Sequence, residues 1–95
     1  LVAEQPQYFI EKAKIECPDS KKELLQQKIF EQVKNENVST IDGVKIWFSD
    51  NSAILIRPSG TEPVFRLYAE AKNQETALKL VEDYTSKLEK ILEKI

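Results

Sequence analysis

The sequence predicts an α+β fold, in which a mainly antiparallel sheet packs two helices on one face in the order β-α-β-β-β-β-α. Two segments repeat apolar residues at three- and four-residue steps, as helices do, and the other segments are short apolar or alternating runs typical of strands. Tight turns join the later strands, and a tight turn connects antiparallel neighbours. A chain of 95 residues holds a single core, so one sheet with both helices on the same face is the simplest way to bury both helical stripes.

The composition is that of a globular domain, with 41% hydrophobic and 32% charged residues. A net charge of −2 disfavours a nucleic-acid partner, because nucleic-acid-binding domains usually carry a basic stripe. No apolar run approaches the roughly 18 residues of a membrane span, so we expect a cytoplasmic protein without a membrane partner. The single cysteine, Cys17, permits no internal disulfide and is predicted to be a buried hydrophobe. The absence of histidine removes the commonest general base.

Residues 1–7 are mixed in character, and Pro6 interrupts any regular element there, so we interpret them as a linker from a preceding domain. The chain begins with Leu1 rather than with methionine, and we therefore expect it to be a piece of a longer polypeptide. Residues 8–95 are the predicted domain.

The first predicted strand spans residues 8–16, with apolar side chains on one face: Phe9, Ala13 and Ile15. A helix follows and runs to about residue 35. Ser20 and Glu23 have the spacing of a capping box, and Asp19 is an equally suitable cap. This helix turns one narrow apolar stripe toward the core: Leu25, Ile29, Phe30 and Val33.

A hairpin is predicted next, because Asp42-Gly43 between the apolar segments 38–41 and 44–49 is typical of a type I′ turn. Two more strands are predicted at 52–57 and 64–71. The chain closes with its clearest helix, which has Asn73 as its cap and a regular apolar stripe: Ala77, Leu80, Val81, Tyr84, Leu88, Ile91, Leu92 and Ile95.

Side-chain alternation along the last three strands predicts which residues face the helices. The helix-facing set is Val44, Ile46, Phe48, Ile54, Ile56, Phe65, Leu67 and Ala69. Their neighbours then lie on the open face or rim of the sheet: Lys45, Trp47, Leu55, Arg57, Arg66 and Tyr68. On that face Trp47 is either half-buried against a neighbouring domain or simply a large strand former.

The stretch Arg57-Pro58-Ser59-Gly60-Thr61-Glu62-Pro63, with Arg66 just beyond it, connects the last two strands. The chain has twelve lysines but two arginines, and both arginines lie beside this one connection. An arginine binds two phosphate oxygens at once, which a lysine does not. Ser59 and Thr61 offer hydroxyl donors, and Gly60 lets the backbone approach a ligand with N–H groups turned inward. The stretch therefore predicts an anion site, most simply for phosphate.

Other interpretations of these residues are open. Proline, serine and glycine are ordinary turn residues, and an arginine can pair with Glu62 or Glu70 instead of a ligand. A second function class is an RNA-binding sheet face on which Trp47 and Tyr68 stack bases, which the acidic balance disfavours. A third is a domain without a ligand whose open face only docks neighbours.

The stretch from Arg57 to Pro63, together with Arg66, closely resembles the phosphate-binding loop in the fourth, C-terminal domain of the α-D-phosphohexomutases. It is most similar to that of the archaeal-type phosphomannomutase/phosphoglucomutases. The resemblance covers essentially the whole chain and implies a TATA-box-binding-protein-like fold. It also implies a set of residues that contact the substrate phosphate: Arg57, Ser59, Gly60, Thr61 and Arg66.

The resemblance further implies an isomerase that moves a phosphoryl group between the two ends of a hexose through a 1,6-bisphosphate. In that family the phosphoserine, the aspartates that hold Mg²⁺ and the sugar-selecting loop belong to other domains. This piece is therefore expected to bind the non-reacting phosphate of a glucose or mannose phosphate. It is expected to have no cofactor and no catalytic or metal-binding residue of its own, and to be inactive alone. Its other partners would be the preceding domains. Phosphoglucosamine mutase, which shares the loop type, is the alternative.

Overall fold

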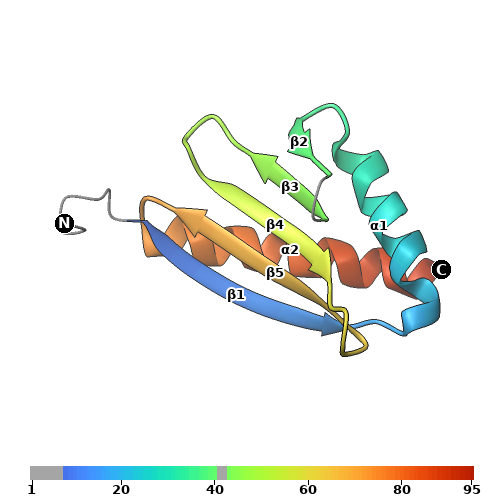
Figure 1. Cartoon of the computed structure of the whole chain (residues 1–95). Coiled ribbons are helices and arrows are strands. Elements are labelled where there is room, and N and C mark those ends of the chain that lie inside the picture. The colour runs from blue at the N-terminus through green and yellow to red at the C-terminus, as the bar shows by residue number, and fades with distance from the viewer. Residues whose placement is uncertain (1–7, 41–42) are drawn as a thin grey trace.

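The computed structural model describes residues 8–40 and 43–95, and over these residues the predicted fold class and element order are confirmed. Five strands form one antiparallel sheet in the order β1-β5-β4-β3-β2, and both helices pack on one face of it (Figure 1). The elements are β1 (Phe9–Glu16), α1 (Asp19–Val33), β2 (Asn37–Ser39), β3 (Val44–Trp47), β4 (Ala53–Pro58), β5 (Val64–Ala71) and α2 (Gln74–Lys94).

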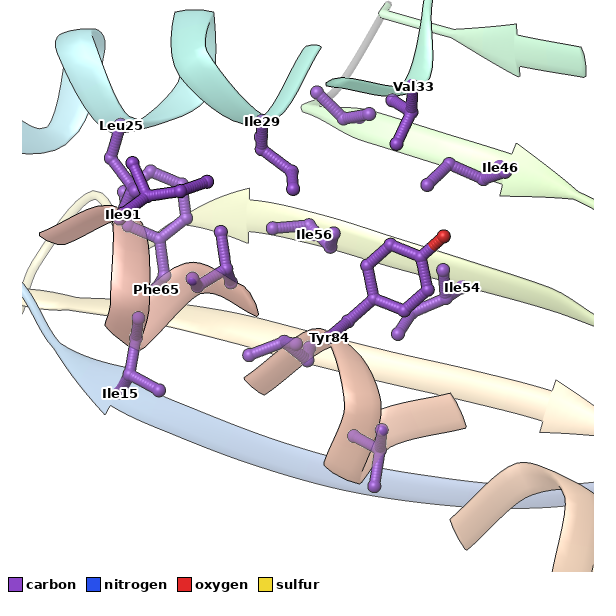
Figure 2. Close-up of a cluster of buried hydrophobic side chains, with 14 of the residues drawn as sticks. Ile15, Leu25, Ile29, Val33, Ile46, Ile54, Ile56, Phe65, Tyr84 and Ile91 are labelled. Atoms are coloured by element: carbon purple, nitrogen blue, oxygen red, sulfur yellow. The ribbon is translucent and has the colours of Figure 1, made fainter. Parts of the chain in front are cut away.

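The sheet has one apolar face and one polar face, as the alternation predicts. Figure 2 shows side chains of the strands meeting those of both helices in one cluster. The predicted helix-facing residues of β3, β4 and β5 are all fully buried: Val44, Ile46, Ile54, Ile56, Phe65, Leu67 and Ala69. Phe48, just after β3, is half-buried with its ring 6.4 Å from that of Tyr84 on α2. The polar face is left uncovered by any element among the described residues.

The start of α2 is as predicted, whereas the start of α1 is not. The Asn73 side chain accepts a hydrogen bond of 2.8 Å from the Thr76 N–H and so caps α2. The capping box predicted for α1 is wrong: Pro18 is the cap residue, and no side chain bonds to the first turn as a cap. Asp19 has a different partner, because it forms an ion pair with Lys22.

The β2–β3 hairpin is confirmed by antiparallel pairing of Val38 with Ile46. Asp42 of the predicted turn and residue 41, the end of the predicted strand before it, lie outside the described residues. Gly43 has a φ of +110°, which a side chain disfavours, and a Cβ there would lie 2.5 Å from the Ile56 carbonyl oxygen. A glycine is therefore required where β3 approaches β4.

Neither α1 nor α2 has the length and apolar character that a membrane-crossing helix needs.

Candidate phosphate site

Residues 59–63 form the loop that joins β4 to β5, and the loop lies beside the connection between β1 and α1 (Figure 1). The Ser59 N–H donates to the Val64 carbonyl at 3.0 Å, which closes the base of the loop. The Cys17 N–H donates to the Pro63 carbonyl at 2.8 Å. The chain segment that enters α1 therefore supports the loop from one side.

Ser59 shapes the loop from within. Its Oγ accepts hydrogen bonds of 3.2 Å from the N–H groups of Thr61 and Glu62, and it lies 3.5 Å from Thr61 Oγ1. The residue is 9% exposed, so the loop folds around this hydroxyl. The sequence predicted that backbone N–H groups of the loop would be free to bind a ligand. Fewer are free than predicted, because the Thr61 and Glu62 amides already bond to Ser59 Oγ. A contact between the Ser59 hydroxyl and a phosphate stays a prediction.

Gly60 is at the exposed tip of the loop, and the fold itself does not need a glycine there. Its φ lies outside the left-handed region, and a Cβ added to it would meet nothing within 4 Å. Among the residues that the structure describes, the Gly60 N–H has no hydrogen-bond partner. The space in front of this residue is open, and its amide is free to bind a ligand.

The two arginines lie side by side on the open face, as predicted. Arg57 of β4 is the cross-strand partner of Arg66 of β5, and Arg66 is the partner of Lys14 of β1. Three cations therefore form one row across three strands, although like charges placed directly opposite each other destabilise a sheet. Next to this row is an open depression of about 310 Å³, which is lined by Lys12, Ala13, Lys14, Arg66 and Tyr68. A bound anion would relieve the repulsion along the row.

The two arginines differ in their partners. Arg66 Nη2 donates to Glu62 Oε1 at 2.5 Å, so pairing with Glu62 is confirmed for this arginine. Glu62 thus offsets one charge at the rim of the loop. Arg57 is exposed and has no ion-pair partner anywhere in residues 8–40 and 43–95. Within the described residues, an ion pair therefore offsets the charge of Arg66 but not that of Arg57.

Lys22 on α1 is a loop contact that sequence reasoning missed. Its Nζ donates to the carbonyl oxygens of Ser59 at 2.6 Å and Glu62 at 2.7 Å. These contacts span 37 and 40 residues of sequence, and no local pattern indicates them. In the sequence Lys22 is one of several lysines on a charged helix face, and only the packing of α1 beside the loop distinguishes it.

The sequence also singled out Cys17 and Trp47. Cys17 is fully buried, as predicted, and burial raises the pKa of its thiol although Lys22 and Lys21 oppose the shift. Trp47 is 39% exposed on the open face, with Lys45 Nζ 5.2 Å from its ring centroid. Within the described part of the chain, no group of three or more Cys, Asp or Glu side chains is placed to hold a metal ion.

Comparison with known proteins identifies the family. The sequence matches the family described as "Phosphoglucomutase/phosphomannomutase, C-terminal domain" over residues 13–87. The chain is 35% identical to a probable phosphoglucosamine mutase of Methanothermobacter thermautotrophicus and 39% identical to a phosphopentomutase of Thermococcus kodakarensis. Each alignment covers 97% of this chain but 22% of the relative. It is also 46% identical to a probable phosphoglucosamine mutase of Methanosphaera stadtmanae, over 65% of this chain and 15% of that protein.

The chain thus spans about a fifth of the length of the first two relatives, and the matched family is defined by a C-terminal domain. The predicted resemblance to the phosphohexomutases is confirmed at the level of the family. The chain belongs to the phosphoglucomutase/phosphomannomutase family, as its C-terminal domain.

Proposed function

We propose that this domain binds the non-reacting phosphate of a phosphosugar within a mutase that moves a phosphoryl group through a sugar bisphosphate. The observation that carries the proposal is that Arg57, at the end of β4, and the Gly60 N–H, in the loop that follows, both lack a partner among the described residues. A phosphate dianion would accept a bidentate contact from the guanidinium and a hydrogen bond from the amide. It would also offset the like charges of Arg57 and Arg66, which are cross-strand partners.

The remaining proposed contacts have different roles. Arg66 would reach the phosphate with one edge of its guanidinium while Glu62 holds Nη2. Thr61 is exposed and would donate its hydroxyl. The Ser59 hydroxyl accepts from two amides, so it would donate its own proton to the phosphate without giving up those bonds. Together these groups would position the substrate and neutralise its charge, while the bond-making chemistry takes place elsewhere.

The sugar is the part of the proposal that this domain does not specify. A relative named for glucosamine and another named for a pentose each align over 97% of the chain. The group common to their named substrates is the phosphate, which favours a phosphate-binding role for this domain over a sugar-selecting one. Phosphoglucosamine mutase therefore stands beside phosphomannomutase/phosphoglucomutase as the activity of the whole protein.

The rest of the whole protein's machinery is proposed to lie outside these residues. The family resemblance implies a phosphoserine and aspartate-bound Mg²⁺ in other domains, and the chain spans about a fifth of its relatives. We accordingly expect no mutase turnover from the 95 residues alone. A cytoplasmic location and the interpretation of residues 1–7 as a linker stay predictions.

The test is a titration of the ¹⁵N-labelled chain with glucose 6-phosphate and with inorganic phosphate, followed by amide chemical shifts at constant ionic strength. We expect millimolar binding with shifts centred on residues 57–66. Gly60→Ala is the matched variant, because its Cβ meets no protein atom within 4 Å but would enter the space in front of the loop. It should keep its unfolding free energy within about 0.5 kcal/mol and lose most of the phosphate affinity.

Two outcomes would contradict the proposal. Shifts spread evenly over the basic face, or centred away from the loop, would indicate loose counter-ion binding. Unchanged phosphate affinity in Gly60→Ala would show that the open space at the tip of the loop is not where the ligand sits.

A further inference from the structure

Lys22, in the first turn of α1, is held against the loop by three acceptors. Its Nζ lies 2.6 Å from the Ser59 carbonyl oxygen, 2.7 Å from that of Glu62 and 2.7 Å from Asp19 Oδ1. An ammonium group has three N–H donors, so these acceptors use all of them. The side chain is 15% exposed, whereas lysines are mostly exposed. This ammonium is fixed in place and does not behave as a mobile surface charge.

The contact with Ser59 sets the direction of the next amide. In a planar trans peptide the carbonyl and the following N–H point in opposite directions, and every peptide bond in the described residues is trans. The Ser59 carbonyl points toward Lys22, so the Gly60 N–H points away from α1. That amide has no protein partner among the described residues and lies at the open tip of the loop.

The ammonium also strengthens the amide as a donor. A cation bonded to a carbonyl oxygen polarises the peptide, and hydrogen bonds in a chain reinforce one another. Lys22 stands at the carbonyl end of the Ser59–Gly60 peptide, and a ligand would stand at its amide end. The positive charge therefore acts on the ligand through the peptide, without a direct contact.

Other bonds that hold the loop do not perform this task. The Cys17 N–H ties down the Pro63 carbonyl, and the Ser59 N–H closes the base of the loop against Val64. Neither bond involves the carbonyl or the amide of the Ser59–Gly60 peptide, and the Ser59 Oγ, which accepts from the Thr61 and Glu62 amides, does not bond to either group. Lys22 is the described side chain that bonds to the carbonyl of that peptide.

We propose that Lys22 is a positioning residue of the phosphate site, which holds the Gly60 N–H in the direction of the bound phosphate without touching the ligand. This inference rests on the proposed function, because it assigns the orientation of one donor in that same site. It predicts that the loss of Lys22 weakens phosphate binding although the side chain lies behind the loop.

The experiment compares four chains in the inorganic phosphate titration: wild type, Lys22→Met, Lys22→Arg and Lys28→Met. Methionine keeps the apolar stem of Lys22 and removes the donors. Lys28 is exposed on the same helix and has no hydrogen bond or ion pair within the described residues, so Lys28→Met removes the same charge without freeing the loop. Urea unfolding of each chain confirms that the fold is retained.

For Lys22→Met we expect phosphate affinity to fall about tenfold, which corresponds to about 1.4 kcal/mol. Lys28→Met should stay within about twofold, and Lys22→Arg should recover part of the loss because it keeps both charge and donors. In the absence of phosphate, the Ser59 carbonyl and Gly60 amide resonances should move in Lys22→Met and stay in place in Lys28→Met. If Lys22→Met does not fold, Lys22→Gln is held to the same limits.

The failures of the two proposals are distinguishable. If the wild type shows no shifts at residues 57–66, the proposed function is wrong and this inference falls with it. If the wild type binds phosphate and Lys22→Met binds it equally well, the loop site stands and the positioning role is refuted. An equal loss in Lys28→Met also refutes that role, since the effect would then be charge alone.

Discussion

Replacing Arg57 with glutamine should stabilise the phosphate-free domain and weaken its binding of phosphate. Arg57 has no ion-pair partner in the described residues and lies opposite Arg66, so its charge is a source of repulsion. Cross-strand pairs contribute roughly 0.2–1 kcal/mol. Glu62 already offsets part of the Arg66 charge, and Arg57 is exposed, which places the expected gain at the low end. We expect the free energy of unfolding to rise by about 0.2–0.5 kcal/mol.

Phosphate should reverse this order of stability. A hydrogen bond to a charged group contributes about 1.5–3 kcal/mol, so losing the bidentate contact should weaken binding by roughly 10- to 150-fold. A ligand stabilises the folded state by RT ln(1 + [L]/Kd), which is about 1.4 kcal/mol at ten times the dissociation constant. Increasing concentrations of inorganic phosphate should therefore stabilise the wild type steadily and the variant hardly at all, as measured by urea unfolding. The two stability curves should cross.

Lys12→Gln is the control for the stability measurement. Lys12 also lies on the open face, but its cross-strand partner is Tyr68, which carries no charge, so its removal should leave the phosphate-free stability unchanged. The reasoning is refuted if Arg57→Gln destabilises the phosphate-free domain by more than about 0.5 kcal/mol, the range expected of an ordinary surface change. It is also refuted if phosphate stabilises the variant as strongly as the wild type.

Two further predictions concern residues next to the loop. Gly43→Ala should lower the unfolding free energy by about 2–4 kcal/mol in urea unfolding, because the new Cβ would lie 2.5 Å from the Ile56 carbonyl oxygen and 2.8 Å from Arg57 Cβ at a φ of +110°. A loss as small as that of Gly60→Ala would contradict this account. Cys17 should react with a thiol reagent at pH 8 more slowly in the folded than in the urea-unfolded chain, by on the order of tenfold or more, because it is buried and its thiol pKa is raised. The raised pKa also makes stability depend on pH: the contribution of the neutral thiol is complete below the pKa of the unfolded thiol and falls as pH rises through the raised folded value. Equal reaction rates in the folded and unfolded chains would refute this account of the Cys17 thiol.

Local pattern was sufficient to predict most of the fold. Alternation along β3, β4 and β5 placed Ile54 and Ile56 in the core and Arg57 outside it, because a buried face imposes a two-residue period on a strand. Asn73 was identifiable as a cap from its position before an apolar repeat. The composition of the loop singled it out as a candidate anion site, since both arginines of a lysine-rich chain lie beside it, and that site stays a prediction.

The features that sequence did not predict depend on contacts between distant segments. The spacing of Ser20 and Glu23 fits a capping box, but Pro18 is the cap residue of the helix and Asp19 pairs with Lys22. The pairing of β1 with β5, at the edge of the sheet, is not expressed in either strand's own residues. The bonds of Lys22 to the loop likewise require α1 to be packed in place.

β1 is one of the two edge strands of the sheet, and it lies beside the candidate phosphate site. An edge strand has a neighbour on one side only, so its amides belong to the parts of a fold that open most readily. This strand carries Lys14 in the row with Arg66, and the chain then continues through Cys17 to Lys22, both of which bond to the loop. A phosphate bound at the loop would therefore stabilise the contacts of the whole segment from Lys14 to Lys22. The free energy needed to separate β1 from the sheet would then rise with phosphate occupancy. Hydrogen exchange of the β1 amides would slow as phosphate binds at the loop.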